Sequence, residues 1–420
     1  MRTRRFPYCL VVGALSLGIV GAGIAFLTLT QTLISSPSAP ALAVEEEAVV
    51  GEDLTEGEAT AWNNAPKLAV GPQGSLHVVY QYAYGKRGEP DRVRYARSAD
   101  GQEWEIVAEW TGRHPTLAVD GEGRVYLAYV ERSAQGDRLW LQIRGASGGD
   151  PVRLLVDAGP PRTRAFPALL LADGALLLAW EVHERAAGGH RIAVAEIPLG
   201  GGSGDGGGEI RREAVVEGEW GVFFPTLALE PRSRKAYLAW QVAVDARRYR
   251  VEVAVREGDR WRRLGSVAGE SGDGRSPTLA PHPRGGVSLA FVSLSFEGQR
   301  ESALYRARIR GEPLRAERLA RRSQGESLAG YADEVIAFPT LAGELLLWGH
   351  TVPNACGVGP LLWALGGAVR GELLGEFASY PHLVPDPNES GVFHLVWTDR
   401  AVEELRAFEV RYARLRLRLR

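Results

Sequence analysis

A glutamate and a histidine two residues apart form the pair in this chain best suited to proton transfer. Glu181 directly follows Trp180, and His183 lies two positions further on. Alternate residues of a β-strand share one face, so both side chains are expected on the same face of an extended segment. A buried carboxylate with a raised pKa can act as a general acid or base. The sequence therefore predicts Glu181 and His183 as a candidate acid/base pair.

A second group of candidate residues combines charged, polar and aromatic side chains in the segments between apolar runs. Arginine binds a carboxylate or sulfate through paired hydrogen bonds, and tyrosine or tryptophan packs against the face of a sugar. This mixture favours an acidic glycan as ligand, whereas the alternative is that charged loop residues are simply solvated. The predicted ligand-binding residues are Tyr82, Tyr84, His114, Glu131, Arg132, Arg185, Trp220, Gln241, Arg247, Arg248, Tyr331, His350 and Arg400.

A phrase that the chain repeats seven times gives these residues a common location. Each copy has an aromatic or small residue, then Pro-x-Leu, a turn, and an apolar run that usually ends in Trp, Tyr or Phe. Repeats of about fifty residues are typical of propeller blades. The sequence therefore predicts an all-β, seven-bladed β-propeller of four-stranded antiparallel blades over residues 44–420. The copies begin at Pro66, Pro115, Pro167, Pro225, Pro277, Pro339 and Pro381.

The second repeat shows how one copy becomes a blade. Its apolar runs predict strands at 115–119, 125–129, 139–143 and 152–156, and Asp120 to Gly123 punctuates the first hairpin. In such a blade, the loop that enters the first strand and the loop that joins the second to the third lie on one rim. The candidate ligand-binding residues are expected on that rim.

The last repeat ends one strand early. Residues 392–397 and 410–419 predict its second and third strands, after which the chain stops. Residues 47–52 (EAVVGE) resemble residues 213–218 (EAVVEG), which occupy a fourth-strand position. We therefore expect the N-terminal part of the chain to close the last blade, which would also remove two exposed sheet edges.

The first 43 residues predict a hydrophobic helix that serves as a signal peptide or a transmembrane anchor. Three arginines within the first five residues precede an uncharged run from Tyr8 to Ile34, which is long enough to cross a bilayer. The basic flank favours an inside N-terminus, so the propeller is expected outside the cytoplasm. Ala41-Leu42-Ala43 has the small-x-small pattern of a signal-peptidase site, so cleavage before Val44 and retention as an anchor both stay open.

Composition narrows the classes of partner and cofactor. Loss of the three N-terminal arginines would leave the remainder more acidic than the whole chain, whose formal charge is −2, so nucleic acid is not expected. Cys356 is the only cysteine after Cys9, so no disulfide is predicted within the propeller. The eight histidines form no His-x-x-x-His or Cys/His cluster, and no phosphate-cradling loop occurs. The sequence thus predicts neither a metal nor a cofactor.

The turn between the third and fourth strands of the first blade carries a family resemblance. The sequence from Ser98 to Trp104 (SADGQEW) resembles the Asp-box turn of sialidase-like, or BNR-repeat, propellers, although it is one residue short of the usual spacing. In that family, Asp boxes stabilise turns on the face opposite the active site. The resemblance therefore implies a structural role for Ser98, Asp100, Gly101 and Trp104.

The same resemblance implies catalytic positions. In the family, arginines bind the carboxylate of the substrate, and a tyrosine is the nucleophile. The sequence from Arg113 to Pro115 is similar to the first arginine phrase, with Gly112 where the family has an aromatic residue. Tyr380, within 378–383 (ASYPHL), is the candidate nucleophile. Alternatively, Tyr380 is one of several aromatic plugs at the start of the blades, because Phe166, Phe224 and Phe338 occupy the same place in their repeats.

These observations together predict an extracytoplasmic ligand-binding or assembly module of the cell envelope. The expected partner is an acidic glycan or an envelope protein, with membrane contact through the N-terminal segment if it is not cleaved. One alternative is a sialidase-like glycoside hydrolase acting on acidic glycans. Another is an accessory subunit of a membrane-anchored envelope complex. No aspartate matches the family's acid/base position, and sialidases of this type usually have six blades.

Overall fold

The computed structural model describes most of the chain after residue 39. The described residues are 40–51, 55, 59–61, 65–83, 90–146, 148–159, 162–184, 189–199, 210–218, 221–295, 301–311, 313–319, 335–340, 343–348, 361–366, 368–375, 378–400 and 408–418. The predicted N-terminal helix lies outside these residues. Among them, no helix is long and apolar enough to cross a membrane.

The described residues form seven antiparallel sheets of four strands each, which confirms the predicted blades. The first blade contains β2 (Leu68–Val70), β3 (Leu76–Ala83), β4 (Arg92–Ser98) and β5 (Glu105–Thr111), with a short 3-10 turn, η1 (Pro72–Gly74), between β2 and β3. The second contains β6 (Arg113–Val119), β7 (Val125–Ser133), β8 (Gly136–Arg144) and β9 (Val152–Ala158). The third contains β10 (Arg162–Ala172), β11 (Ala175–Glu184), β12 (Gly189–Pro198) and β13 (Arg211–Gly218).

The remaining blades follow the same order. The fourth contains β14 (Val222–Leu229), β15 (Ala236–Ala243), β16 (Tyr249–Glu257) and β17 (Arg260–Val267). The fifth contains β18 (Arg275–Pro281), β19 (Val287–Ser295), β20 (Glu301–Ile309) and β21 (Ala316–Leu319). The sixth contains β22 (Val335–Thr340), β23 (Gly343–Trp348), β24 (Leu361–Leu365) and β25 (Ala368–Leu374). The seventh contains β26 (Ser379–Pro385), β27 (Val392–Arg400), β28 (Phe408–Arg418) and β1 (Ala41–Val49).

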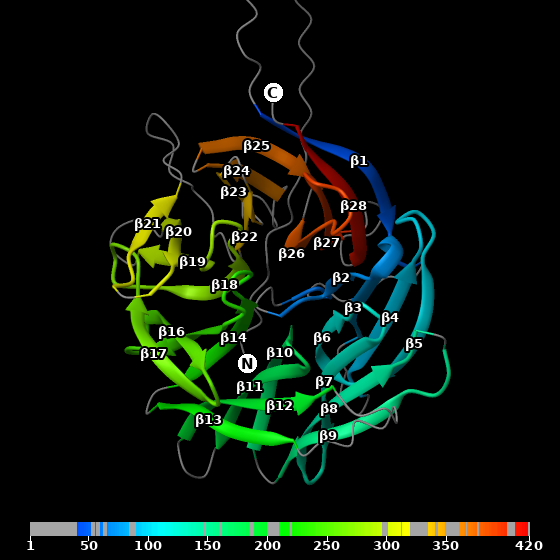
Figure 1. The fold of residues 1–420 in the computed structure, drawn as a ribbon, viewed down its shortest axis with the longest axis horizontal. Helices are drawn as coiled ribbons and strands as arrows, with labels where there is room; N and C mark the ends of the chain where they lie inside the picture. Colours follow the sequence, from blue (N-terminus) through cyan, green and yellow to red (C-terminus); the bar gives the residue numbers. More distant parts are fainter. Residues whose placement is uncertain are drawn as a thin grey trace, which may run out of the picture. The chain divides into compact units, whose positions relative to one another are not determined.

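Hydrophobic cores between neighbouring blades close the ring. Seven clusters of buried apolar side chains each join two adjacent blades, and one of them joins the seventh blade to the first. Figure 1 shows the first strand of each blade innermost and the fourth outermost. Because the inner strands are covered on both faces, they are apolar with little alternation. The tryptophans that end the apolar runs, Trp180, Trp240, Trp348 and Trp397, are buried in these interfaces.

The repeated proline phrase has a structural basis in a bulge at the start of the first strand. In five blades the residue before proline has a positive φ of 47 to 53°, and the strand register shifts across it. A left-handed conformation is uncommon outside glycine, and proline disfavours the right-handed helical region for the residue before it. The five residues are His114, Phe166, Phe224, Ser276 and Tyr380.

The leucines of the phrase line a central channel. Leu68, Leu169, Leu227, Leu279 and Leu383 all border a cavity of about 310 Å³ between the first strands. We call the rim where the first strands begin the proline rim, and the opposite one, which carries the Ser98 to Trp104 turn, the Asp-box rim. At the proline rim, the rings of His114, Phe166 and Phe224 stack with centroid distances of 4.1 and 4.9 Å. Phe166 and Phe224, two of the aromatic residues predicted at the blade entrances, thus lie together here with His114.

The N-terminal closure of the last blade is confirmed, but its predicted boundaries were wrong. The closing strand is β1, which pairs antiparallel with β28 from Ala41 opposite Arg418 to Val49 opposite Arg411. It therefore starts six residues before the predicted 47–52 segment. Leu42 is 9% exposed and packs with Leu415 and Leu417 in the core of blades six and seven. The Ala41-Leu42-Ala43 sequence is thus part of the folded blade.

Candidate functional site

Several polar side chains at the proline rim link one blade to the next. Each follows the buried aromatic residue of a second strand and accepts a main-chain N–H of the following blade. The Oε1 atom of Glu181 accepts the N–H of Phe224 at 2.5 Å, and the Oε1 atom of Gln241 accepts that of Ser276 at 3.0 Å. Gln81 binds the N–H of His114 in the same way at 3.2 Å. These three side chains hold the left-handed bulges in place.

Glu181 and His183 lie together, as the sequence predicted. Nε2 of His183 is 2.9 Å from Oε2 of Glu181, although the angles of this contact fall outside those of a hydrogen bond. The side chain of Glu181 is fully buried, whereas that of His183 is 22% exposed. Burial raises the pKa of the Glu181 carboxyl, and the nearby His183 opposes this shift. A raised carboxyl pKa beside a partly exposed imidazole meets one requirement for acid/base chemistry.

Aromatic rings surround this pair. We call Glu181, His183, His190, Phe223 and Tyr249 the rim cluster. The imidazoles of His183 and His190, which are paired across β11 and β12, stack at 4.2 Å, and Phe223 meets both edge-on. Burial, followed by the charge of His183, lowers the pKa of His190. The cluster therefore presents imidazole and aromatic surfaces at the junction of the third and fourth blades.

Arg113 lies in a buried network at the junction of the second and third blades. It is 7% exposed, and its guanidinium donates to Oδ2 of Asp137 at 2.9 Å. The same oxygen accepts the main-chain N–H of Arg164, whose guanidinium binds both carboxylate oxygens of Asp157 at 2.7 and 3.1 Å. Burial lowers the pKa of Arg113, and Asp137 opposes this shift. Arg113 thus already binds a carboxylate of its own chain.

Tyr380 belongs to the plug positions of the proline rim. It has the left-handed backbone of the other pre-proline residues, with φ of 52°, and its carbonyl accepts the hydroxyl of Thr60 at 2.9 Å. The carbonyl of Thr60 lies 2.8 Å from Nε2 of His382. Burial, followed by the charge of Lys67, lowers the pKa of His382 to about 3. The backbone around Tyr380 is therefore firmly placed at the junction of the first and seventh blades.

The other described rim residues contact different partners in separate blades and do not share one site. Tyr82 lies under the guanidinium of Arg94 at 3.4 Å in the first blade. Glu131 accepts Nε1 of Trp140 at 2.6 Å and the guanidinium of Arg153 at 2.8 Å, both within the second blade. Arg132 is largely exposed, 3.9 Å from Asp91.

In the fourth blade, Arg248 pairs with Asp245 at 2.7 Å, and the main-chain N–H of Arg247 donates to the same carboxylate at 2.9 Å. Both arginines are exposed. Five predicted residues lie outside the described part of the chain, and only the backbone of Arg400 is described. Those five are Tyr84, Arg185, Trp220, Tyr331 and His350.

The Asp-box-like turn is a compact hydrogen-bonded unit on the opposite rim. Oδ1 of Asp100 accepts the N–H groups of Gln102 and Glu103, and these contacts lower its pKa. Ser98 Oγ accepts the N–H of Gly101 at 2.8 Å, and Trp104 Nε1 donates to the carbonyl of Gly101 at 3.0 Å. Trp104 also packs edge-on against Tyr412 at 5.3 Å, so the turn ties the first blade to the seventh.

Sequence reasoning missed the acids that organise the proline rim. Asp137, Asp157 and Asp273 each bind an arginine between blades or within the rim, and Asp273 is fully buried. The sequence does contain a sign of these ion pairs, because an arginine lies two or three residues before the repeat proline in three blades. His190 was also missed, although it lies opposite His183 across β11 and β12. In the described part of the chain, no group of three or more His, Cys, Asp or Glu residues could hold a metal ion.

Comparison with solved structures supports the fold. No model of a known protein family matches the chain, and no curated protein sequence does. An unknown-function protein from Dyadobacter fermentans matches with 12% identity and a TM-score of 0.50, over 90% of this chain and 100% of that one.

Two structures of named enzymes also match. The α-L-arabinofuranosidase of Fusarium graminearum in complex with an iminosugar inhibitor has 10% identity and a TM-score of 0.49, over 89% and 98% of the two chains. The Trypanosoma rangeli sialidase in complex with sialic acid has 9% identity and a TM-score of 0.46, over 87% and 59%. At identities of 9 to 12%, these likenesses concern the fold alone.

Proposed function

We propose that this protein is an extracytoplasmic binding module that holds an acidic glycan without cleaving it. The observation that carries this proposal is the buried pairing of Arg113 with Asp137. An arginine that grips a substrate carboxylate must offer its guanidinium to that ligand, and breaking a buried ion pair to do so is costly. Glu181 is committed in a similar way to the N–H of Phe224. Two of the four predicted catalytic side chains thus have structural partners: Glu181 links the third blade to the fourth, and Arg113 binds the carboxylate that accepts the N–H of Arg164 in the next blade.

The polar ligand class is supported by the chemistry of the proline rim. The rim cluster offers the imidazole of His183 beside the edge of Phe223, and Arg247 and Arg248 are exposed in the same blade as Tyr249. Aromatic faces pack against sugars, and exposed guanidinium groups bind carboxylates or sulfates. The hydrophobic N-terminal segment, with its basic flank, supports a location outside the cytoplasm.

A second candidate function, glycan hydrolysis, is favoured by one observation. Glu181 has a raised pKa and lies 2.9 Å from His183, as a general acid/base pair would. In this alternative, Tyr380 is the nucleophile that the family resemblance implies. Its ring would need access to the substrate from a plug position in the channel mouth.

A glycan array of acidic and neutral sugars, run beside a fluorogenic assay for sialic acid release, tests both functions. Binding to acidic glycans without turnover is expected. Turnover that Tyr380→Phe abolishes, with the thermal midpoint unchanged, would establish hydrolysis instead. An inactive result in both assays would contradict both functions and favour a protein partner in the envelope.

A further inference from the structure

Ser75, His77 and Tyr95 form a hydrogen-bonded chain on the Asp-box rim of the first blade. Oγ of Ser75 lies 3.0 Å from Nε2 of His77, and Nδ1 of His77 lies 2.7 Å from the hydroxyl of Tyr95. Ser75 directly precedes β3, while His77 and Tyr95 lie on the paired strands β3 and β4 with their rings nearly parallel. A hydroxyl beside a base that a third group orients is the arrangement of an activated nucleophile.

Two other blades use a carboxylate to hold the residue equivalent to His77. The carboxylate lies five residues after the repeat proline, as Asp120 in the second blade and Asp386 in the seventh. Each one accepts two main-chain N–H groups of its own turn. Each also lies 3.0 Å from the second-strand side chain at the position of His77, which is Tyr126 or His394. In these blades the arrangement stabilises the turn.

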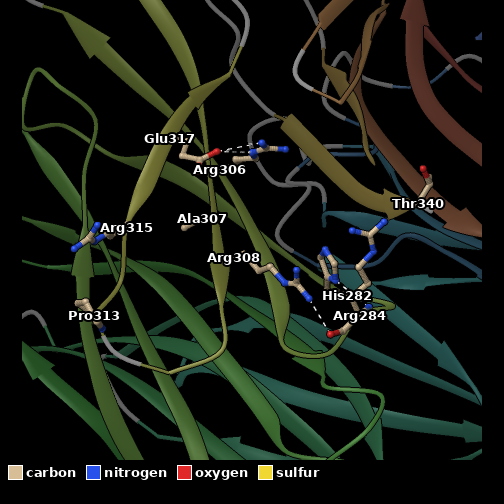
Figure 2. A pocket seen from close by; sticks show the side chains of 9 residues that line it. All are labelled: His282, Arg284, Arg306, Ala307, Arg308, Pro313, Arg315, Glu317 and Thr340. Carbon is tan, nitrogen blue, oxygen red and sulfur yellow. Dashed lines mark hydrogen bonds and ion pairs between the residues drawn. The ribbon is translucent and has the colours of Figure 1, made fainter. Parts of the chain in front are cut away.

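The first blade has a glycine at this turn position. In the fifth blade His282 takes the position, and its Nδ1 accepts the main-chain N–H of Arg284 at 3.0 Å; Figure 2 shows both side chains. In the first blade the residue is Gly71, where a Cβ would lie 2.5 Å from Oγ of Ser75 and 2.9 Å from Nε2 of His77. The hydroxyl of Ser75 therefore lies beside the space that a side chain would take. His77 is thus paired with a hydroxyl instead of a carboxylate.

The protonation states in this chain suit proton transfer from Ser75. Burial, followed by the charge of Arg97, lowers the pKa of His77 to about 4, so the imidazole is neutral at pH 7. Burial raises the pKa of Tyr95 to about 12, so the phenol keeps its proton. With its proton on Nδ1, His77 donates to the oxygen of Tyr95 and accepts the hydroxyl of Ser75 at Nε2. The other contact of this hydroxyl, to the carbonyl of Pro72, is longer at 3.4 Å.

The chain borders a groove that also contains an unpaired guanidinium group. The groove lies between the first and second blades and encloses about 410 Å³, within the range of sites that bind small molecules. Arg144 of β8 lines it, with its guanidinium 5.7 Å from the centre of the Tyr95 ring. Nε of Arg144 is buried without a hydrogen-bond partner, and no acid of the described segments pairs with this arginine. In the turn between β8 and β9, only Ser147 lies outside those segments, and it carries no charge.

We infer that Ser75 and His77 hydrolyse an acyl ester that carries an anionic group, in this groove of the Asp-box rim. Arg144 binds the anionic group, because a guanidinium forms paired hydrogen bonds with a carboxylate or a phosphate. Tyr95 is a positioning residue that fixes the tautomer and the orientation of the imidazole. This activity lies on the opposite rim from the proposed glycan site and does not depend on it.

The reaction follows from the order of the three side chains. Oγ of Ser75 attacks the ester carbonyl while its proton passes to Nε2 of His77. The bond to the alcohol breaks, and the alcohol leaves with that proton, so the acyl group stays on Ser75. Water then attacks the acyl group and gives a proton to Nε2. The acyl group leaves as a carboxylic acid, and the proton on Nε2 returns to Ser75.

A fluorophosphonate reagent tests the nucleophile in the full-length protein in detergent. The reagent forms an oxygen–phosphorus bond with an activated serine and loses fluoride. Trypsin cleaves after Lys67 and Lys86, and the peptide between these sites contains Ser75 as its only serine, so mass spectrometry locates the label. We expect labelling at Ser75, none in Ser75→Ala, and a rate about 100-fold lower in His77→Gln. The matched control is His394→Gln, which removes the equivalent histidine of the seventh blade and should leave the labelling rate unchanged.

Turnover of two matched esters tests the substrate class. These are 4-acetoxybenzoate, which carries a carboxylate, and its methyl ester, which does not. We expect kcat/KM for release of acetate to be about tenfold higher for 4-acetoxybenzoate, and Arg144→Gln to remove this preference while hydrolysis of the methyl ester continues. Tyr95→Phe keeps the ring but loses the oxygen that orients His77, so kcat should fall about tenfold with KM unchanged.

Thermal midpoints equal to that of the wild type verify that each variant is folded, and Tyr95→Phe replaces His77→Gln if the latter is not. Absence of label on Ser75 in the wild type overturns the inference. Release of acetate that Ser75→Ala retains also overturns it. A preference for the anionic ester that survives in Arg144→Gln overturns the role of Arg144.

Discussion

Replacing Glu181 by glutamine and by alanine separates a structural role of this side chain from a catalytic one. Gln81 and Gln241 accept the same kind of main-chain N–H at equivalent positions, so an amide oxygen is sufficient for the contact. Glu181→Gln should therefore preserve the link to Phe224. Glu181→Ala leaves that N–H without its acceptor at a buried site, which costs about 1–3 kcal/mol of unfolding free energy.

The pH dependence of the two proteins should differ in a defined direction. Burial raises the pKa of Glu181 in the folded state above its value in the unfolded chain. The folded wild type then binds the extra proton, so its stability falls as pH rises from the ordinary glutamate pKa through the raised one. Glu181→Gln lacks this titration and should gain stability relative to the wild type over that interval. His183 also faces the carboxylate, so His183→Gln serves as a background that removes its contribution.

Urea unfolding at pH 4 and pH 8 measures these differences. The Gln variant should match the wild type most closely at pH 4, below the ordinary glutamate pKa, and exceed it at pH 8, while the Ala variant is weaker at both. Gln241→Ala is the matched control, because it removes the hydrogen-bond acceptor of the Ser276 N–H in the same way. If Glu181→Gln lost as much stability as Glu181→Ala, the acceptor role would be refuted.

Three further changes probe other parts of the ring. Leu42→Ala should lower the free energy of unfolding by about 2–3 kcal/mol and speed hydrogen exchange in β28, because Leu42 is buried. Val44→Ala, at a 38% exposed position, should change it by less than about 0.5 kcal/mol. Equal effects of the two variants would contradict closure of the blade by β1. Gly101→Ala should destabilise the protein more than Gly258→Ala. Both glycines have a positive φ, but only at Gly101 would an added Cβ meet the Tyr412 ring, at 2.5 Å. Similar thermal midpoints of the two variants would argue against that packing. His382, with a pKa of about 3 in the folded protein, binds fewer protons there than in the unfolded chain, so stability should fall as pH drops from 6.5 toward 3. His382→Gln should reduce this slope of unfolding free energy against pH by up to about 1.4 kcal/mol per pH unit. An unchanged slope would exclude His382 as its source.

The sequence predicted the features that repeat and missed those that depend on a neighbouring blade. The Pro-x-Leu phrase predicted the blades because each copy forms the same inner hairpin, and five of its leucines border one cavity. The pairing of Arg164 in the third blade with Asp157 in the second depends on which residues meet at the blade junction, and no local sequence pattern reports this. The start of β1 was misplaced because the resemblance between 47–52 and 213–218 marks only the end of the strand, while Leu42 gains its burial from blade six.

The pairing of β1 with β28 also constrains how the protein is made. β1 is the first described strand to be synthesised and β28 the last, so β1 has no partner until all the other described strands have been made. An unpaired strand edge invites association with other chains, which makes this interval the one most exposed to aggregation. A polypeptide that ends before Phe408 lacks β28, so β1 has nothing to pair with and the seventh blade keeps only two strands. Closure of the seventh blade therefore requires a chain synthesised through β28.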